Sequence, residues 1–482
     1  MPNQQNISPP ETDPFRGLPM FAASDPQALT EEKAKLAELK NQPFLKRWRG
    51  YFTLTGPGWL QSALTLGGGS AMASLFAGAY LQYKLLWVQP IAMLIGIIML
   101  AAISQQTLAT GVRPFHMMKR ILHPTVAWAW VFGALAVTII WHFPQYALAA
   151  GMTEDMINVF TGLEPTPATR TAILIGIGLV FLTISTAVTW SYGTGHKGVR
   201  LYERMLKSFV WLIIVAFAVV VTRQALAGRI EWAKLFKGFL PSQLPRDDPR
   251  VVTVVVAAFS AAVGINSTFL LSYSLLARGW TKEHRSLSWF DLITGTFLPF
   301  SIVTSLVIIA AATTIHNPQL LASGSTKLSP IEAAAMFEAA GLNRILARLV
   351  FGLGILGMTL STITVHMLMC GFAVCEMFGV EPGGWRYRLA CLLPAPAVSG
   401  VIFWKYMGSW IAVPASAICG LLLPFAYIIF FILNNSKKYL GTDKPVGTKA
   451  ILWNIAMLIA IIVSITSAGY YLYMNLIRTH GT

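Results

Sequence analysis

The sequence predicts an all-α, polytopic membrane protein. Of its 482 residues, 55% are apolar and only 12% are charged, and the mean hydropathy is +0.60. Soluble domains typically carry about 25% charged residues. The composition therefore excludes an ordinary soluble enzyme, a disordered chain and a secreted disulfide scaffold. Runs of about 20 mostly apolar residues, the length that an α-helix needs to cross a bilayer, recur along the whole chain.

Eleven apolar runs are expected to be membrane-spanning helices, and the ninth is the shortest and weakest of them. The longest connections, 228–250 and 315–343, are too short to hold a soluble domain. The expected spans are 53–82, 85–110, 126–151, 171–191, 204–227, 251–277, 288–315, 344–378, 389–404, 408–433 and 449–477.

The distribution of Lys and Arg predicts a cytoplasmic N-terminus. With the polar segment 1–50 taken as a cytoplasmic tail, 23 of the 36 basic residues fall on the inner side and 12 on the outer side, including the extracellular loop 228–250. Cytoplasmic loops are enriched in these residues. The net charge of +16 thus reflects topology, and no nucleic-acid partner is expected. We expect a multi-pass protein of a bacterial-type inner membrane.

Two spans carry interruptions at membrane depth. Gly67-Gly68-Gly69-Ser70 interrupts the first span, and Gly264-Ile265-Asn266-Ser267-Thr268 interrupts the sixth. Paired broken helices at corresponding positions of two halves indicate the binding site of a secondary transporter, although glycines also serve close helix packing. A spacing of five spans fits two inverted repeats, 51–227 and 251–433. Segment 434–482 then holds a cytoplasmic loop, the eleventh span and a short C-terminus.

Several stretches resemble the Nramp family of metal-ion transporters. The resemblance covers nearly all of residues 50–440 and implies the LeuT-type fold of 5+5 inverted repeats, with about 11 transmembrane helices and alternating access. The stretches are GPGWLQSALTLGGGSAMASLFAGAYLQYKLLWV (Gly56–Val88), WAKLFKGFLPSQLP (Trp232–Pro245), STIT (Ser361–Thr364) with Gly371, Phe372 and Glu376, and LPFA (Leu423–Ala426) with Asn434–Gly441.

The sequence departs from the family where the family binds its metal. The motif Asp-Pro-Gly-Asn falls on Gly67–Ser70, and Met-Pro-His-Asn falls on Gly264–Ser267. The glutamines expected in the tenth span fall on Ser416 and Leu422, and the third-span carboxylates fall on Gln145 and Leu148. A transition-metal ion prefers imidazole, thioether or carboxylate ligands, so no metal-ligating residue is assigned. The small replacements predict an enlarged cavity.

Neutral residues near the breaks are the predicted site. His142 and Gln145 of the third span are candidates for a proton or ion pathway, since a histidine at membrane depth can carry a proton. A backbone-bonded, structural His142 is the alternative, and His366 is assigned to packing. The candidate substrate-binding residues are Gly67, Gly68, Gly69, Ser70, Gly264, Asn266, Ser267, Thr359 and Ser416.

Three functions remain open from the sequence. The resemblance implies transport of a divalent metal cation such as Mn²⁺, Fe²⁺ or Mg²⁺. The replaced ligands favour a larger organic or hydrated cationic solute, and a non-transporting sensor or scaffold is the third possibility. No Walker loop, nucleophile elbow or zinc-protease motif occurs in the sequence, so an enzyme is not expected. The expected partners are a small solute or ion and the lipid bilayer, for a chain that is plausibly monomeric, with no cofactor.

Overall fold

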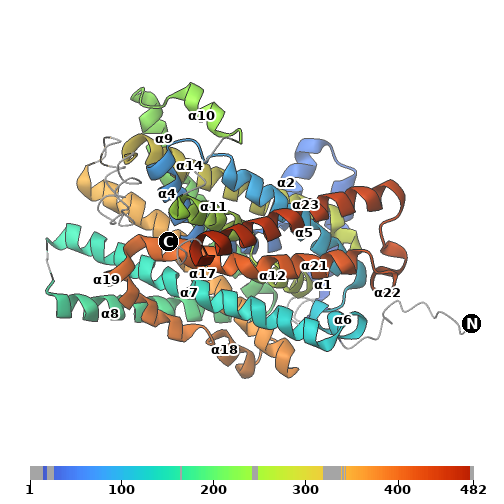
Figure 1. The fold of residues 1–482 in the computed structure, drawn as a ribbon. Coiled ribbons are helices and arrows are strands. Elements are labelled where there is room, and N and C mark those ends of the chain that lie inside the picture. Colours follow the sequence, from blue (N-terminus) through green and yellow to red (C-terminus); the bar gives the residue numbers. More distant parts are fainter. Residues whose placement is uncertain are drawn as a thin grey trace, which may run out of the picture.

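A computed structural model describes residues 15–18, 26–162, 165–241, 248–317, 338, 341 and 343–477. Within these residues the chain is helical, and its only β-pairing is an isolated bridge between Arg16 and Val112. Long helices run side by side as a bundle (Figure 1). Helices α1 (Pro26–Lys40), α6 (Pro114–Ile121) and α22 (Lys437–Leu440) lie at the same end of this bundle (Figure 1).

In the described residues, nine helices are long and apolar enough to cross a membrane, and one bent pair of helices makes a tenth candidate span. Ten of the eleven expected spans are therefore found as apolar helices. The spans that consist of a single helix are α5 (Val88–Thr110), α7 (Pro124–Thr161), α8 (Pro167–Tyr192), α9 (His196–Leu226), α17 (Arg344–Phe378) and α23 (Gly447–Leu472). The spans that consist of two or three consecutive helices are α3–α4 (Pro57–Thr65, Gly68–Leu81), α11–α12 (Pro249–Ala262, Ile265–Ala277), α13–η2–α14 (Arg285–Leu292, Ile293–Phe297, Leu298–Thr314) and α20–η5–α21 (Ala412–Cys419, Gly420–Leu422, Leu423–Asn434).

The predicted ninth span is a run of short helices. It contains α18 (Trp385–Cys391), the 3₁₀-helix η3 (Ala395–Phe403) and α19 (Trp404–Met407). The run contacts α8, where the Trp190 indole donates to the Arg388 carbonyl at 3.0 Å. A 3₁₀-helix rises about 2 Å per residue, so η3 alone extends about 18 Å. The sixteen residues 389–404 can therefore cover most of a hydrocarbon core of about 30 Å.

The sixth span lies at the centre of the bundle. In its most apolar window 89% of residues are buried, whereas only 22% are buried in the corresponding windows of α8 and α23. Spans α8 and α23 therefore present most of their surface to lipid. The interrupted helix α11–α12 instead packs against protein on all sides, which is where an unwound backbone can be tolerated in a membrane.

The predicted N-terminal tail contains two helices, α1 and α2 (Phe44–Leu54). Helix α1 is tied to the bundle by Glu32, whose carboxylate is only 3% exposed. It accepts hydrogen bonds from Arg278 at 2.9 Å, from the Trp280 indole at 2.9 Å and from Arg200 at 3.1 Å. A buried carboxylate requires such partners, so α1 is part of the folded structure.

The loop predicted at 228–250 contains α10 (Trp232–Gly238). Its Gly238 carbonyl accepts from the Trp87 backbone N–H at 2.9 Å, which places the loop against the turn between the first two spans. Residues 242–247 of this loop, together with parts of the stretch that resembles the family there, lie outside the described residues.

Candidate substrate site

The first span breaks at Leu66 and Gly67. Helix α3 ends at Thr65, and α4 begins at Gly68 in a direction 52° away. The Gly68 backbone N–H donates to the Gln145 side-chain oxygen at 2.9 Å, and the Ser70 hydroxyl donates to the Gly67 carbonyl at 3.0 Å. The break therefore lies at Gly67, the first residue of the predicted interruption, and at the residue before it, and Gly68 to Ser70 form the first turn of α4.

The sixth span breaks at Val263 and Gly264, which have extended backbones. The Ser267 hydroxyl accepts from the Gly264 N–H at 3.2 Å and so caps α12. The Gln61 side chain donates to the Ser267 carbonyl at 3.3 Å, which joins the first turn of α12 to α3. Both breaks are completely buried, and this bond joins the two interrupted spans.

Neighbouring side chains fill the space above each glycine. A Cβ atom added to Gly67 would lie 2.8 Å from the Thr362 hydroxyl, and one added to Gly264 would lie 2.6 Å from the Asn266 oxygen. At Gly68 and Gly69 it would collide with Leu148 and Ser416. The enlarged cavity predicted from the small residues is thus absent in this conformation. The cavity between the breaks is about 10 Å³, room for about one water molecule.

The cavity is neutral. Polar groups line it together with Leu64, Pro144 and Ala261, and no acidic or basic side chain takes part. No group of three or more His, Cys, Asp or Glu side chains that could hold a metal ion occurs in the described part of the chain. The polar and aromatic lining residues are Thr65, Gly67, Gly69, Ser70, Trp141, Gln145, Thr362 and Ser416.

Asn266 is the most unusual polar group at the breaks. Its side chain is completely buried, and neither its amide nitrogen nor its oxygen has a hydrogen-bond partner within the described residues. A buried amide without partners costs roughly 1–3 kcal/mol. This unused capacity lies next to Gly264 but outside the lining of the closed cavity, so a ligand that can both accept and donate reaches it only when the site opens.

Of the predicted residues, the cavity lining includes Gly67, Gly69, Ser70, Gln145 and Ser416, and does not include Gly68, His142, Gly264, Asn266, Ser267 and Thr359. Thr359 does not line the cavity, and its hydroxyl donates to the Ile355 carbonyl of its own helix at 3.0 Å. Thr362, one turn later, lines the cavity and donates to the Ala63 carbonyl at 2.8 Å. The two threonines are three residues apart and share a face of α17, so the exchange reflects their positions along the helix axis relative to the break.

The predicted pathway residue His142 pairs with His366. Their Nδ1 atoms lie 3.2 Å apart, both rings are completely buried, and neither Nε2 atom has a partner within the described residues. Only one of the two Nδ1 atoms can carry the proton of this hydrogen bond. The imidazoles lie between α7 and α17 beside Trp141, whereas Gln145 contacts the break directly.

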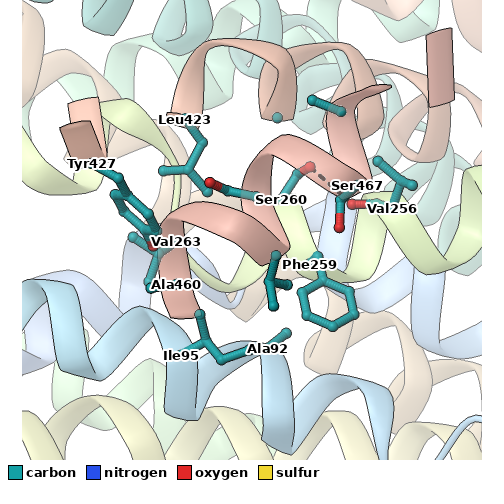
Figure 2. Close-up of a pocket in the computed structure, with 14 residues that line it drawn as sticks. Ala92, Ile95, Val256, Phe259, Ser260, Val263, Leu423, Tyr427, Ala460 and Ser467 are labelled. Carbon is teal, nitrogen blue, oxygen red and sulfur yellow. Dashed lines mark hydrogen bonds between the residues drawn. The ribbon is translucent and has the colours of Figure 1, made fainter. Parts of the chain in front are cut away.

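A second small cavity lies behind the sixth-span break (Figure 2). It has a volume of about 20 Å³ and is lined by α5, α11, α21 and α23. Two of its hydroxyl groups bond within their own helices, Ser260 to the Val256 carbonyl at 2.8 Å and Ser464 to the Ile461 carbonyl at 2.8 Å. With apolar walls such as Ile95 and Phe259, this cavity is a packing gap beside the substrate site.

Comparison with known proteins identifies the family of this chain. A family model described as natural resistance-associated macrophage protein-like, or Nramp, matches residues 58–473. The chain belongs to the Nramp family. The match includes both broken spans, so the breaks occur in the parts of the chain that the family shares. Nramp proteins are transporters, and this chain is accordingly not an enzyme.

Curated relatives cover most of the chain. A protein of Nostoc named divalent metal cation transporter MntH is 23% identical over 424 residues, covering 86% of this chain and 90% of its own. A Brucella suis protein of the same name is 24% identical over 409 residues, covering 82% and 83%. At this distance the Nramp scaffold is shared while individual site residues can differ.

Solved structures confirm the LeuT-type fold. The Eremococcus coleocola manganese transporter, in complex with an aromatic bis-isothiourea compound, matches with a TM-score of 0.63, 15% identity and 88% coverage of both chains. MhsT, in complex with L-phenylalanine, matches with a TM-score of 0.58 and 16% identity, covering 85% of this chain and 98% of its own. The all-helical, multi-pass architecture predicted for this Nramp member is therefore confirmed.

Proposed function

We propose that this Nramp protein is a secondary transporter that carries a hard divalent cation, with part of its water shell, across the membrane by alternating access. The observation that carries the proposal is the pair of broken spans within one family match, joined at a neutral cavity of single-water size. Spans α3–α4, α5, α11–α12 and α13–α14 would rock against the remaining spans around this cavity.

The donor set supports a hard cation. The cavity offers hydroxyl, amide and carbonyl oxygens from residues such as Ser70, Gln145 and Thr362, and the C-terminal ends of α3 and α11 direct backbone carbonyls toward the breaks. Mg²⁺ binds oxygen ligands and keeps several of its waters, whereas softer ions prefer sulfur and nitrogen ligands. Because the cavity has no carboxylate, the cation must retain water, and the affinity of the site for the cation would be weak.

Uptake into proteoliposomes tests the proposal. Purified protein is reconstituted, and saturable entry of Mg²⁺ and Mn²⁺ is measured beside a panel of amino acids and amines. We expect Mg²⁺ to enter and to be preferred over Mn²⁺. The control is Gly69→Val, whose new side chain collides with Ser416 and closes the cavity. If the control transports Mg²⁺ as fast as the parent, or if no cation enters, the proposal fails.

A small polar organic solute is the second candidate, and Asn266 is the observation that favours it. The unused donor and acceptor of this amide match a solute that carries both kinds of group. Like a cation that keeps several waters, such a solute requires the cavity to widen, because about 10 Å³ has room for about one water molecule. Uptake of one amino acid or amine in the same panel, unaffected by Mg²⁺, would establish this candidate. Uptake of nothing would favour a sensor or scaffold.

We further propose the bacterial-type inner membrane as the location, with the N-terminus in the cytoplasm and His142 and Gln145 along the ion path. The proposed orientation is supported by the basic residues of the inner loops. The candidate site residues Gly67, Gly68, Gly69, Ser70, Gly264, Asn266, Ser267 and Ser416 are retained in this proposal.

A further inference from the structure

A large polar cavity opens at the end of the bundle where α1 and α22 lie, and it shares no lining residue with the substrate site. Its volume is about 600 Å³, within the range of small-ligand sites. It is formed where α5, α13 and α21 meet the start of α23, and its walls include Arg285, Asp443, Lys444 and Lys449.

The cavity carries excess positive charge. Asp443 is the only acidic side chain among its lining residues, and it is already paired with Arg285 at 2.8 Å and with Lys282 at 2.5 Å. Lys444 and Lys449 form no ion pair with any described residue. Arg285 also keeps a buried Nε–H without a partner in the described chain. These donors suit a phosphate group, for which lysine is a point-charge ligand.

The outer wall of the cavity marks the boundary between lipid and water. Trp289 and Trp453 lie across it with their rings 6.0 Å apart, and tryptophan is enriched at membrane interfaces. One turn beyond Lys449, α23 exposes Ile451, Leu452 and Ile455, each more than half exposed. A ligand whose phosphate lies in the cavity therefore meets an apolar surface of helix α23 directly beside it.

We infer that this cavity binds the headgroup of an anionic phospholipid, with its acyl chains lying along the exposed face of α23. The basic cavity supplies the charge for the phosphate, and the exposed isoleucine and leucine side chains supply the surface for the chains. Basic pockets between transmembrane helices bind acidic headgroups in this way. A water-soluble phosphate shares the headgroup chemistry but makes no use of the apolar face of α23.

Native mass spectrometry of the full-length chain tests the inference. The protein is equilibrated with mixed micelles of phosphatidylcholine and phosphatidylglycerol, and the retained lipids are counted. We expect retention of phosphatidylglycerol and, for the double variant Lys444→Gln/Lys449→Gln, a loss of roughly tenfold or more, because each basic residue contributes about 1 kcal/mol to anionic-lipid binding.

The matched control is Lys437→Gln/Lys438→Gln, which removes the same charge from α22, next to the cavity but outside its lining. We expect it to retain phosphatidylglycerol. Thr442→Trp places a bulky side chain at the cavity wall without a change of charge and should weaken retention of the lipid. Equal loss in both double variants, or equal retention of phosphatidylcholine, overturns the inference. Displacement of the lipid by inorganic phosphate or glycerol phosphate would instead make this a site for a soluble anion, which also overturns it.

Discussion

At the scale of single residues, mutation of Asn266 and mutation of Ser267, both in the first turn of α12, are expected to have opposite effects on stability. Asn266→Leu replaces a buried amide without partners by an apolar group of the same shape, which is nearly neutral or stabilising. Ser267→Ala removes the hydroxyl that accepts from the Gly264 N–H and should lower the free energy of unfolding by roughly 1–3 kcal/mol. Thermal melting in detergent measures both effects.

Transport should separate the same pair of variants. We expect Asn266→Leu to lose uptake although it melts as high as the parent, because the proposed site uses its amide to bind the substrate. A stable Asn266→Leu protein with full uptake would remove Asn266 from the site. A strongly destabilised one would show that the amide has a structural role instead.

The missing metal ligands make a second prediction at this scale. Gly67→Asp combined with Gly264→Met returns a carboxylate and a thioether to the two breaks, and the pair should create Mn²⁺ binding that the parent lacks. Thr362 must rotate to admit the new side chain at Gly67, because its hydroxyl lies 2.8 Å from the added Cβ atom. Isothermal titration with Mn²⁺ measures the gain.

The matched control is Gly67→Asn/Gly264→Met, which has the same size without the charge. It should bind Mn²⁺ much more weakly than the aspartate variant. If the parent already binds Mn²⁺ tightly and Gly67→Asp changes nothing, the assignment of a neutral central site is wrong.

Single residues also show how far the sequence determines the site. The predicted interruptions locate both breaks to within two residues, because three consecutive glycines weaken the first helix and Gly264, followed by Asn266 and Ser267, weakens the sixth. The filling of the glycine positions by Leu148 and Ser416 was not predictable, because it depends on how α7 and α20 pack against α4. The pairing of His142 with His366 depends in the same way on the contact between α7 and α17.

At the scale of elements, helix α1 depends on one buried carboxylate. Glu32 accepts from Arg278, Arg200 and the Trp280 indole, whereas its neighbour Glu31 is exposed. Removing one partner of a buried ion pair typically costs 3–5 kcal/mol. Because Arg278 keeps Glu203 at 3.6 Å, we expect Glu32→Ala to cost about 2–3 kcal/mol, and Glu31→Ala to cost little.

Limited proteolysis with melting measures this prediction. Detachment of α1 should make its peptide bonds cleavable in Glu32→Ala but leave them protected in Glu31→Ala. Equal protection in the two variants would show that α1 is held by its apolar contacts, such as those of Leu36, and not by the carboxylate.

The ninth span shows that the number of residues alone does not give the length of a helical segment. Sixteen residues look too few for a membrane crossing if an α-helical rise of 1.5 Å per residue is assumed. Pro394 and Pro396 lie inside 389–404, where they prevent one regular α-helix from running through the whole stretch, and the 3₁₀-helix η3 has a larger rise per residue. The sequence shows the prolines, but the choice of 3₁₀ geometry depends on packing against α7 and α8.

At the scale of the whole molecule, the proposed orientation makes a labelling prediction. The four cysteines are buried and should not react with a membrane-impermeant maleimide. Introduced into this background, Lys234→Cys in α10 should be labelled in intact cells, and Lys438→Cys in α22 should be labelled only after the membrane is opened. The reverse pattern would invert the orientation. Labelling of the parent protein would show that the natural cysteines are accessible.

The order of the spans could be predicted almost completely, because apolar length and basic loops act locally along the chain. Ten apolar spans and the paired breaks occur where the sequence predicts them. The closed centre could not be predicted. Its volume depends on side chains from α7, α17 and α20 that are distant in sequence and meet only in the folded bundle.

The buried Glu32 also sets an order of events during synthesis. Its partner Arg278 is made 246 residues later. At about 5–20 residues per second, this interval lasts roughly 12–50 seconds. Until the sixth span has been inserted, the carboxylate has no buried cation to receive it and must remain in water. Helix α1 therefore docks late on the growing protein, and its docking marks chains in which the first six spans have been assembled.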